Sequence, residues 1–147
     1  MFDLAALSQA LVAHGRTARV VIAAHDGSSP REVGASMLVW ASGQSGTVGG
    51  GALEFEAAAK ARAMLVGDAR AVDRVALGPA LGQCCGGAVT LWTEVYDALP
   101  VSEAGVIARG PGEMPLAVKR ILAAARGQGL RPSPGLVQGW LVEPVAV

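Results

Sequence analysis

The 147-residue chain is poor in cysteine and in aromatic residues, and it has no excess of charge of either sign. Its two cysteines, Cys84 and Cys85, are adjacent, so they do not form the disulfide framework of a small secreted protein. Lysine and arginine number 12 and so do aspartate and glutamate, which gives no basic surface for nucleic acid. We therefore expect a protein of the reducing cytoplasm that does not bind nucleic acid.

Long hydrophobic runs are also missing. The longest ones, such as residues 20–24 and 37–41, are far shorter than the roughly 20 residues that a membrane span needs. The first residues, Met1 to Leu4, lack the basic start of a secretory signal. Hydrophobic residues nevertheless make up 52% of the chain, which is enough for a proper core. Any apolar surface left over favours self-association, so we expect a homodimer with no membrane partner.

The hydrophobic pattern predicts an α+β fold, in which one mixed sheet packs with about three helices in a single domain over residues 1–147. Helical spacing and glycine stops predict helices near residues 4–15, 52–67 and 115–127. Apolar runs and alternation predict strands at residues 19–24, 35–41, 70–77, 88–96, 106–108 and 136–145, with a hairpin connection at 42–46. The motifs described below lie within residues 15–96, and residues 97–147 are less regular.

The cysteines lie in the stretch Gly82-Gln83-Cys84-Cys85-Gly86-Gly87, between two predicted strands. Glycine lets the backbone turn sharply and leaves little around the sulfur atoms to shield them. Neighbouring Cα atoms are about 3.8 Å apart, whereas a disulfide prefers roughly 5.5 to 6 Å, so a bond between these cysteines would be strained. The stretch is either a glycine turn with two small buried residues or a loop that presents thiols to a ligand.

A second motif is the run Gly49-Gly50-Gly51, which comes directly before the clearest predicted helix and is followed by Glu54. Free N–H groups at such a helix start bind phosphate or another oxyanion, and glycine lets the anion approach closely. The pattern is neither a dinucleotide fingerprint nor a P-loop. Alternatively, the glycines permit close packing and Glu54 complements the helix dipole.

A third motif is the polar loop of residues 27–34, which follows the first predicted strand. Ser28, Ser29 and Arg31 together supply hydroxyl and guanidinium donors for an anion. The alternative is a solvated loop in which Arg31 pairs with Glu32. The preceding His25 has no metal-ligand spacing around it and is interpreted as an ordinary residue at a strand end.

Taken together and in this order, the three motifs resemble the XdhC/CoxI family of molybdoenzyme accessory proteins. The resemblance is strongest over residues 15–96. Full-length members of that family carry a C-terminal Rossmann-like domain, so the present chain resembles the N-terminal-type domain. A separate Rossmann-domain subunit is therefore among the partners that the resemblance implies.

The resemblance implies a chaperone, rather than a turnover enzyme, that transiently binds the molybdenum cofactor (molybdopterin). It would assist cofactor sulfuration and insertion into a xanthine dehydrogenase-type molybdoenzyme, with a cysteine desulfurase as sulfur donor. Cys84 and Cys85 would handle sulfur, and one of them would lie near molybdenum. The residues expected to contact the cofactor are Gly49, Gly50, Gly51, Glu54, Gln83, Cys85, Gly86, Ser29 and Arg31.

Two other functions compete with this one. A thiol enzyme would pass sulfur or electrons through Cys84 and Cys85 without any pterin. A non-catalytic module would bind a partner protein and keep the motifs only as scaffold.

Overall fold

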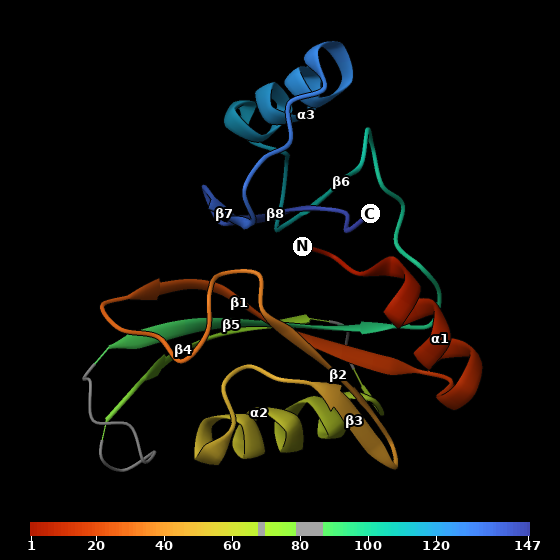
Figure 1. Cartoon of the computed structure of the whole chain (residues 1–147), viewed down its shortest axis with the longest axis vertical. Coiled ribbons are helices and arrows are strands. Elements are labelled where there is room, and N and C mark those ends of the chain that lie inside the picture. Colours follow the sequence, from red (N-terminus) through yellow and green to blue (C-terminus); the bar gives the residue numbers. More distant parts are fainter. Residues whose placement is uncertain (68–69, 79–86) are drawn as a thin grey trace. The chain divides into compact units, whose positions relative to one another are not determined.

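A computed structural model describes residues 1–67, 70–78 and 87–147 (Figure 1). The chain divides into two compact units. One comprises residues Ala5–Leu99, and the other comprises Met1–Leu4 with Pro100–Val147. Each unit is described by itself.

The larger unit is built on a five-stranded sheet in the order β3-β2-β1-β5-β4. All neighbouring strands in it run antiparallel. The central strand β1 is buried along its first seven residues, as expected of a continuous apolar run that is covered on both faces. The strands are β1 (Thr17–Asp26), β2 (Ser36–Trp40), β3 (Gly43–Gly46), β4 (Arg70–Ala76) and β5 (Ala88–Tyr96).

Helix α2 (Gly51–Met64) covers one face of this sheet, as Figure 1 shows below β1 and β5. Leu53, Ala58 and Ala61 are its buried residues. They pack in one apolar cluster with side chains of β1, β2 and β5, and burying a side chain such as Leu53 contributes about 1.5–3 kcal/mol. Helix α1 (Leu4–His14) precedes β1 and ends at Gly15, whose φ of 76° ends the helix with a left-handed residue.

The smaller unit contains a three-stranded antiparallel sheet in the order β6-β8-β7 and helix α3. The N-terminus joins this sheet through Phe2, whose N–H donates to the Pro144 carbonyl at 2.8 Å and whose carbonyl accepts from Ala146 at 2.9 Å. The elements are β6 (Val106–Arg109), α3 (Leu116–Gln128), β7 (Gly135–Val137) and β8 (Trp140–Pro144).

The structure confirms the α+β class and the three helices, and it corrects three details. The expected mixed sheet is two antiparallel sheets, because neighbouring strands run in opposite directions throughout. The single strand expected at 136–145 is a hairpin, because Gln138 and Gly139 both have positive φ, as a two-residue hairpin turn requires. Residues 43–46, expected as a connection, form strand β3.

The smaller unit contains a buried ion pair. Nη2 of Arg109 lies 2.8 Å from Oε1 of Glu143, and their side chains are 11% and 0% exposed. The Arg109 guanidinium also lies 5.4 Å from the centre of the Phe2 ring. Removing one partner of such a pair leaves the other charge buried and uncompensated.

We therefore expect Glu143→Ala to lower the free energy of unfolding by about 3–5 kcal/mol. Urea denaturation followed by fluorescence measures this loss. The control is Glu113→Ala, which removes the same charge from an exposed position and should change the stability by about 0.5 kcal/mol or less. A loss of similar size in both variants would contradict the cost of an uncompensated Arg109 charge.

Candidate functional site

All three sequence motifs follow or precede strand ends at the same end of the larger sheet. The last residue of β1, Asp26, pairs with Ala88 at the start of β5, and Ala88 also pairs with Ala76 at the end of β4. Gly46, the last residue of β3, pairs with Met37 near the start of β2. The connections that carry the motifs therefore leave the sheet together at this end.

Glu54 holds the triple-glycine turn in place. Its Oε1 accepts hydrogen bonds from the Thr47 hydroxyl at 2.5 Å and from the N–H groups of Val48 and Gly50 at 2.9 and 3.2 Å. The Thr47 hydroxyl is the largest cause that lowers the pKa of Glu54, and the turn N–H groups add to it, while partial burial opposes the shift. This carboxylate from the first turn of α2 thus reaches back to the residues before the helix, as in a capping box.

The turn uses up part of the donor set that the sequence predicts for an anion. The N–H of Gly49 donates to the Thr47 hydroxyl oxygen at 3.0 Å, and the N–H of Gly50 is bound to Glu54. Within the described residues, the N–H groups of Gly51, Ala52 and Leu53 have no hydrogen-bond partner. These three donors at the start of α2 are therefore the ones available to an oxyanion.

The three glycines have different roles. At Gly49 an added Cβ would lie 2.4 Å from Cβ of Pro30, so this glycine permits close packing against the 27–34 loop. At Gly50 and Gly51 an added Cβ would meet nothing within 4 Å, yet φ is 74° and 65°. There glycine serves the backbone conformation rather than the packing. The packing interpretation of the triple glycine thus holds at Gly49, whereas Gly50 and Gly51 suit the positive φ of the turn.

Ser29 and Arg31 bond within the protein. The Ser29 hydroxyl donates to the Arg31 carbonyl at 2.7 Å, and Arg31 Nη1 donates to the Thr47 carbonyl at 3.3 Å. The same guanidinium binds the Glu32 carboxylate at 2.9 Å, which lowers the pKa of Glu32 to about 2. Arg31 therefore pairs with Glu32, as the alternative interpretation expects, and also connects its loop to the residue that binds Glu54.

Gln83, Cys84, Cys85 and Gly86 lie outside the described residues. Their described neighbours make close contacts. The N–H of Leu77 donates to the Gly87 carbonyl at 2.7 Å, and an added Cβ on Gly87 would lie 2.1 Å from the Ser28 carbonyl oxygen. The residue that follows the cysteine motif is thus packed directly against the 27–34 loop.

The remaining ionisable groups show no metal centre. In the described part of the chain, no three His, Cys, Asp or Glu side chains gather in a way that would hold a metal ion. Nδ1 of His25 lies 3.0 Å from the Gly27 carbonyl, and His14 stacks on Trp40 with ring centres 4.0 Å apart. Within residues 1–67, 70–78 and 87–147, no helix is long and apolar enough to cross a membrane.

Sequence reasoning missed Thr47 and Pro30, which connect the motifs. Thr47 binds Glu54 through its hydroxyl and Arg31 through its carbonyl. Pro30 fills the space that Gly49 leaves open. The spacing of Thr47 and Glu54, seven residues apart with Gly50 at the helix N-cap, is not that of a capping box, so no sequence pattern pairs them. Nothing in the sequence pairs Pro30 with Gly49.

The lowered pKa of Glu54 predicts how stability depends on pH. Because the folded-state pKa is below the ordinary value of 4.5, this carboxylate stabilises the fold above about pH 4.5, and the contribution disappears as pH falls through the folded pKa. Glu54→Gln should thus cost about 1 kcal/mol at pH 7 and less at pH 3.

Urea denaturation of both proteins between pH 7 and pH 3 measures this difference. Glu56→Gln is the matched control, because it removes the same charge from an exposed position on the same helix. A Glu54→Gln effect that is constant with pH, or no larger than that of Glu56→Gln, would refute the role of the carboxylate in the turn.

Comparison with known proteins gives the site its context. Residues 10–75, from α1 to β4, match the model of the XdhC and CoxI family. A crystal structure described as a xanthine dehydrogenase from Bacillus halodurans is similar, with 25% sequence identity and a TM-score of 0.57. The match covers 65% of this chain but only 30% of that one, and no curated protein matches. Over residues 10–75, therefore, the chain is similar to the XdhC and CoxI family, which confirms the resemblance predicted from its motifs.

Proposed function

We propose that this protein is an accessory factor that transiently binds the molybdenum cofactor and assists its sulfuration and insertion into a xanthine dehydrogenase-type molybdoenzyme. The family match over residues 10–75 supports this proposal, as does the similarity to a structure described as a xanthine dehydrogenase. The observation that carries it is the convergence of the motifs. Pro30 packs on Gly49, Arg31 binds Thr47, and Gly87 packs on Ser28.

The start of α2 suits the phosphate end of such a cofactor. The N–H groups of Gly51, Ala52 and Leu53 point out of the helix N-terminus, where the helix dipole favours negative charge. Gly50 and Gly51 carry no side chain that would obstruct the approach. Glu54 acts indirectly in this arrangement, because its Oε1 is bonded to the turn and keeps these N–H groups in position.

The cysteine motif supplies the sulfur chemistry of the proposal. The molybdenum cofactor brings a sulfur-ligated metal that suits thiolate neighbours. The thiolate of Cys84 or Cys85 attacks the outer sulfur of a persulfide on a cysteine desulfurase, and the desulfurase cysteine leaves as a thiolate. The acceptor cysteine then carries the persulfide. Gln83 and Gly86 flank this group in the sequence.

The partners follow from the same proposal. They are the client molybdoenzyme, the desulfurase, a separate Rossmann-domain subunit and a second copy of this chain. The protein delivers a cofactor and is not itself a turnover enzyme.

Retention of the cofactor tests the binding role. Released molybdenum cofactor is mixed with the purified protein, and the amount that coelutes on size exclusion is measured. We expect saturable retention by the natural protein. Gly50→Val should weaken it by about tenfold or more, because distorting the turn removes hydrogen bonds to a charged group.

The matched control is Gly112→Val, since Gly112 also has a positive φ, of 69°, and open space around its Cβ, but lies in the smaller unit. Equal retention by the two variants would assign the glycines to the fold alone. If the natural protein retains no cofactor, the binding role is wrong, and a thiol enzyme or a partner-binding module is favoured.

A coupled assay tests the sulfur role separately. The protein is loaded with cofactor and incubated with a cysteine desulfurase and the apo form of a xanthine dehydrogenase-type enzyme, whose activity is then measured. Cys84→Ala or Cys85→Ala should retain the cofactor and lower activation by at least tenfold, since the attacking thiolate is lost. If both variants activate fully, the sulfur role is wrong even where binding stands.

A further inference from the structure

Strand β4 forms one edge of the larger sheet and carries seven residues, Arg70–Ala76. In the described part of the chain it pairs with β5 alone. Its outer side thus presents backbone N–H and C=O groups that a further strand would pair with. Exposure alternates along β4, with Arg70, Val72 and Arg74 on the exposed face.

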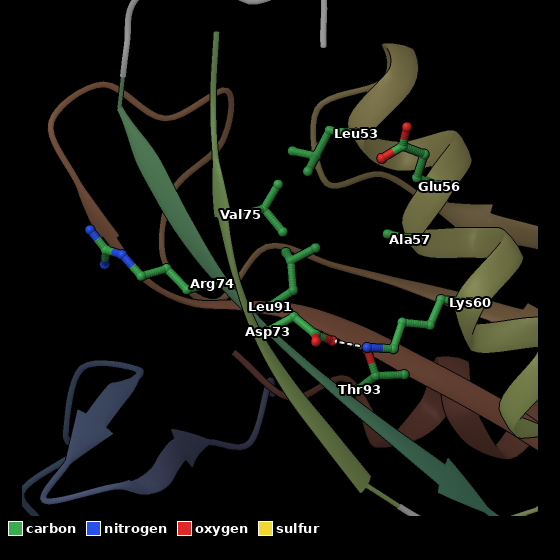
Figure 2. Close-up of a pocket in the computed structure, with 9 residues that line it drawn as sticks. All are labelled: Leu53, Glu56, Ala57, Lys60, Asp73, Arg74, Val75, Leu91 and Thr93. Carbon is green, nitrogen blue, oxygen red and sulfur yellow. Dashed lines mark hydrogen bonds and ion pairs between the residues drawn. The ribbon is translucent and has the colours of Figure 1, made fainter. Parts of the chain in front are cut away.

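A groove lies beside this edge, between β4 and helix α2 (Figure 2). Its volume is about 270 Å³. Leu53 and Ala57 of α2 face Val75 and Leu91 of the sheet across it, and Lys60 forms an ion pair with Asp73. Figure 2 shows Asp73 and Val75 directed towards α2 and Arg74 directed away from it.

A groove between a helix and an open strand edge suits an extended peptide. The main chain of the peptide pairs with the edge strand, and alternate side chains enter the groove. We propose that β4 binds an extended segment of a partner protein as an additional strand. In this segment, acidic side chains lie opposite Arg70 and Arg74, and an aliphatic side chain lies opposite Val72.

The acidic positions follow from the exposed face of β4. Arg74 is 62% exposed in its side chain and lies 2.7 Å from Asp26, whose side chain is 71% exposed. Arg70 lies over the Trp92 ring at 5.0 Å, which orients its guanidinium, and contacts Glu94 at 3.3 Å. The Arg74–Asp26 pair is exposed and contributes little, and a guanidinium has five N–H donors, so Arg74 can bind a further carboxylate. The Arg70 side chain is 36% exposed, whereas that of its partner Glu94 is only 9% exposed, so a further carboxylate would bind the outer N–H donors of Arg70.

The aliphatic positions of the proposed segment follow from Val72 and from the apolar residues that line the groove. Val72 is 51% exposed between the two arginines, so an aliphatic neighbour would remove apolar surface from water. On the other face, side chains of the added strand flank the groove floor of Leu53, Ala57, Val75 and Leu91. The recognised segment thus has the pattern acid, three aliphatic residues, acid.

Charge disfavours a second copy of β4 as the occupant. A twofold axis that pairs a strand with its own copy in antiparallel fashion is perpendicular to the sheet, so opposed residues share a face. The registers that pair at least five of the seven residues centre on Val72, Asp73 or Arg74. The register centred on Val72 places Arg70 opposite Arg74, and the other two place Asp73 or Arg74 opposite its own copy. Like charges that lie opposite each other are destabilising, so all three registers are disfavoured.

The probe for this proposal is a fluorescein-labelled peptide with the core Glu-Val-Val-Val-Glu between Gly-Ser linkers. Anisotropy titration should give saturable binding, and a peptide with Lys in both Glu positions should bind about tenfold more weakly, since each cross-strand charge pair contributes up to about 1 kcal/mol. Hydrogen exchange should show that the amides of residues 70–76 gain protection when the Glu peptide is bound.

Arg74→Glu should abolish the preference, because Arg70 still favours the Glu peptide while the new carboxylate at position 74 favours the Lys peptide. Arg74→Gln removes the charge without reversing it and should reduce the preference about threefold. The matched control is Arg120→Glu, which makes the same change at an exposed site on α3 and should leave the preference unchanged.

The proposal is overturned if neither peptide binds saturably, if the Arg74 variants keep the original preference, or if bound peptide leaves the amides of 70–76 unprotected. It is also overturned if the protein alone forms a dimer in which these amides are already protected, because the edge would then belong to a second copy.

Discussion

The candidate site depends on one carboxylate, that of Glu54. A turn of three glycines has more backbone freedom than any other run of its length, and fixing it costs conformational entropy. Glu54 compensates for part of this cost by accepting hydrogen bonds from Thr47, Val48 and Gly50 with a single oxygen. The result is a defined helix start in which the N–H groups of Gly51, Ala52 and Leu53 have no partner among the described residues.

The same network explains why motifs distant in the sequence meet. Thr47 binds Glu54 with its hydroxyl and Arg31 with its carbonyl, so one residue joins the triple-glycine turn to the 27–34 loop. Gly87 joins that loop to the residues that flank the cysteines. Each junction needs a glycine, since a Cβ at Gly49 or Gly87 would overlap its neighbour. The glycines of the motifs are thus distributed between close contacts and an open helix start.

Local patterns predicted much of this fold, and long-range contacts account for what they missed. The α2 helix and the alternation of β5 follow from side-chain periodicity, which acts over a few residues. The hairpin of β7 and β8 depends on positive φ at Gln138, which periodicity does not reveal. Likewise, the residue type of Arg31 suits an anion and its neighbour Glu32 suits an ion pair, but its bond to Thr47 is determined by how two loops meet.

The two edges of the larger sheet differ in a way that bears on recognition. Strand β3 has four residues, two of them glycine, and offers little side-chain surface for a further strand. Strand β4 is longer, carries two arginines around an exposed valine, and lies beside a groove. Charges on an edge usually prevent self-association. On β4 the charged side chains disfavour pairing with a second copy of β4, whereas the two arginines complement an acidic strand. The same side chains therefore disfavour self-association and favour an acidic partner.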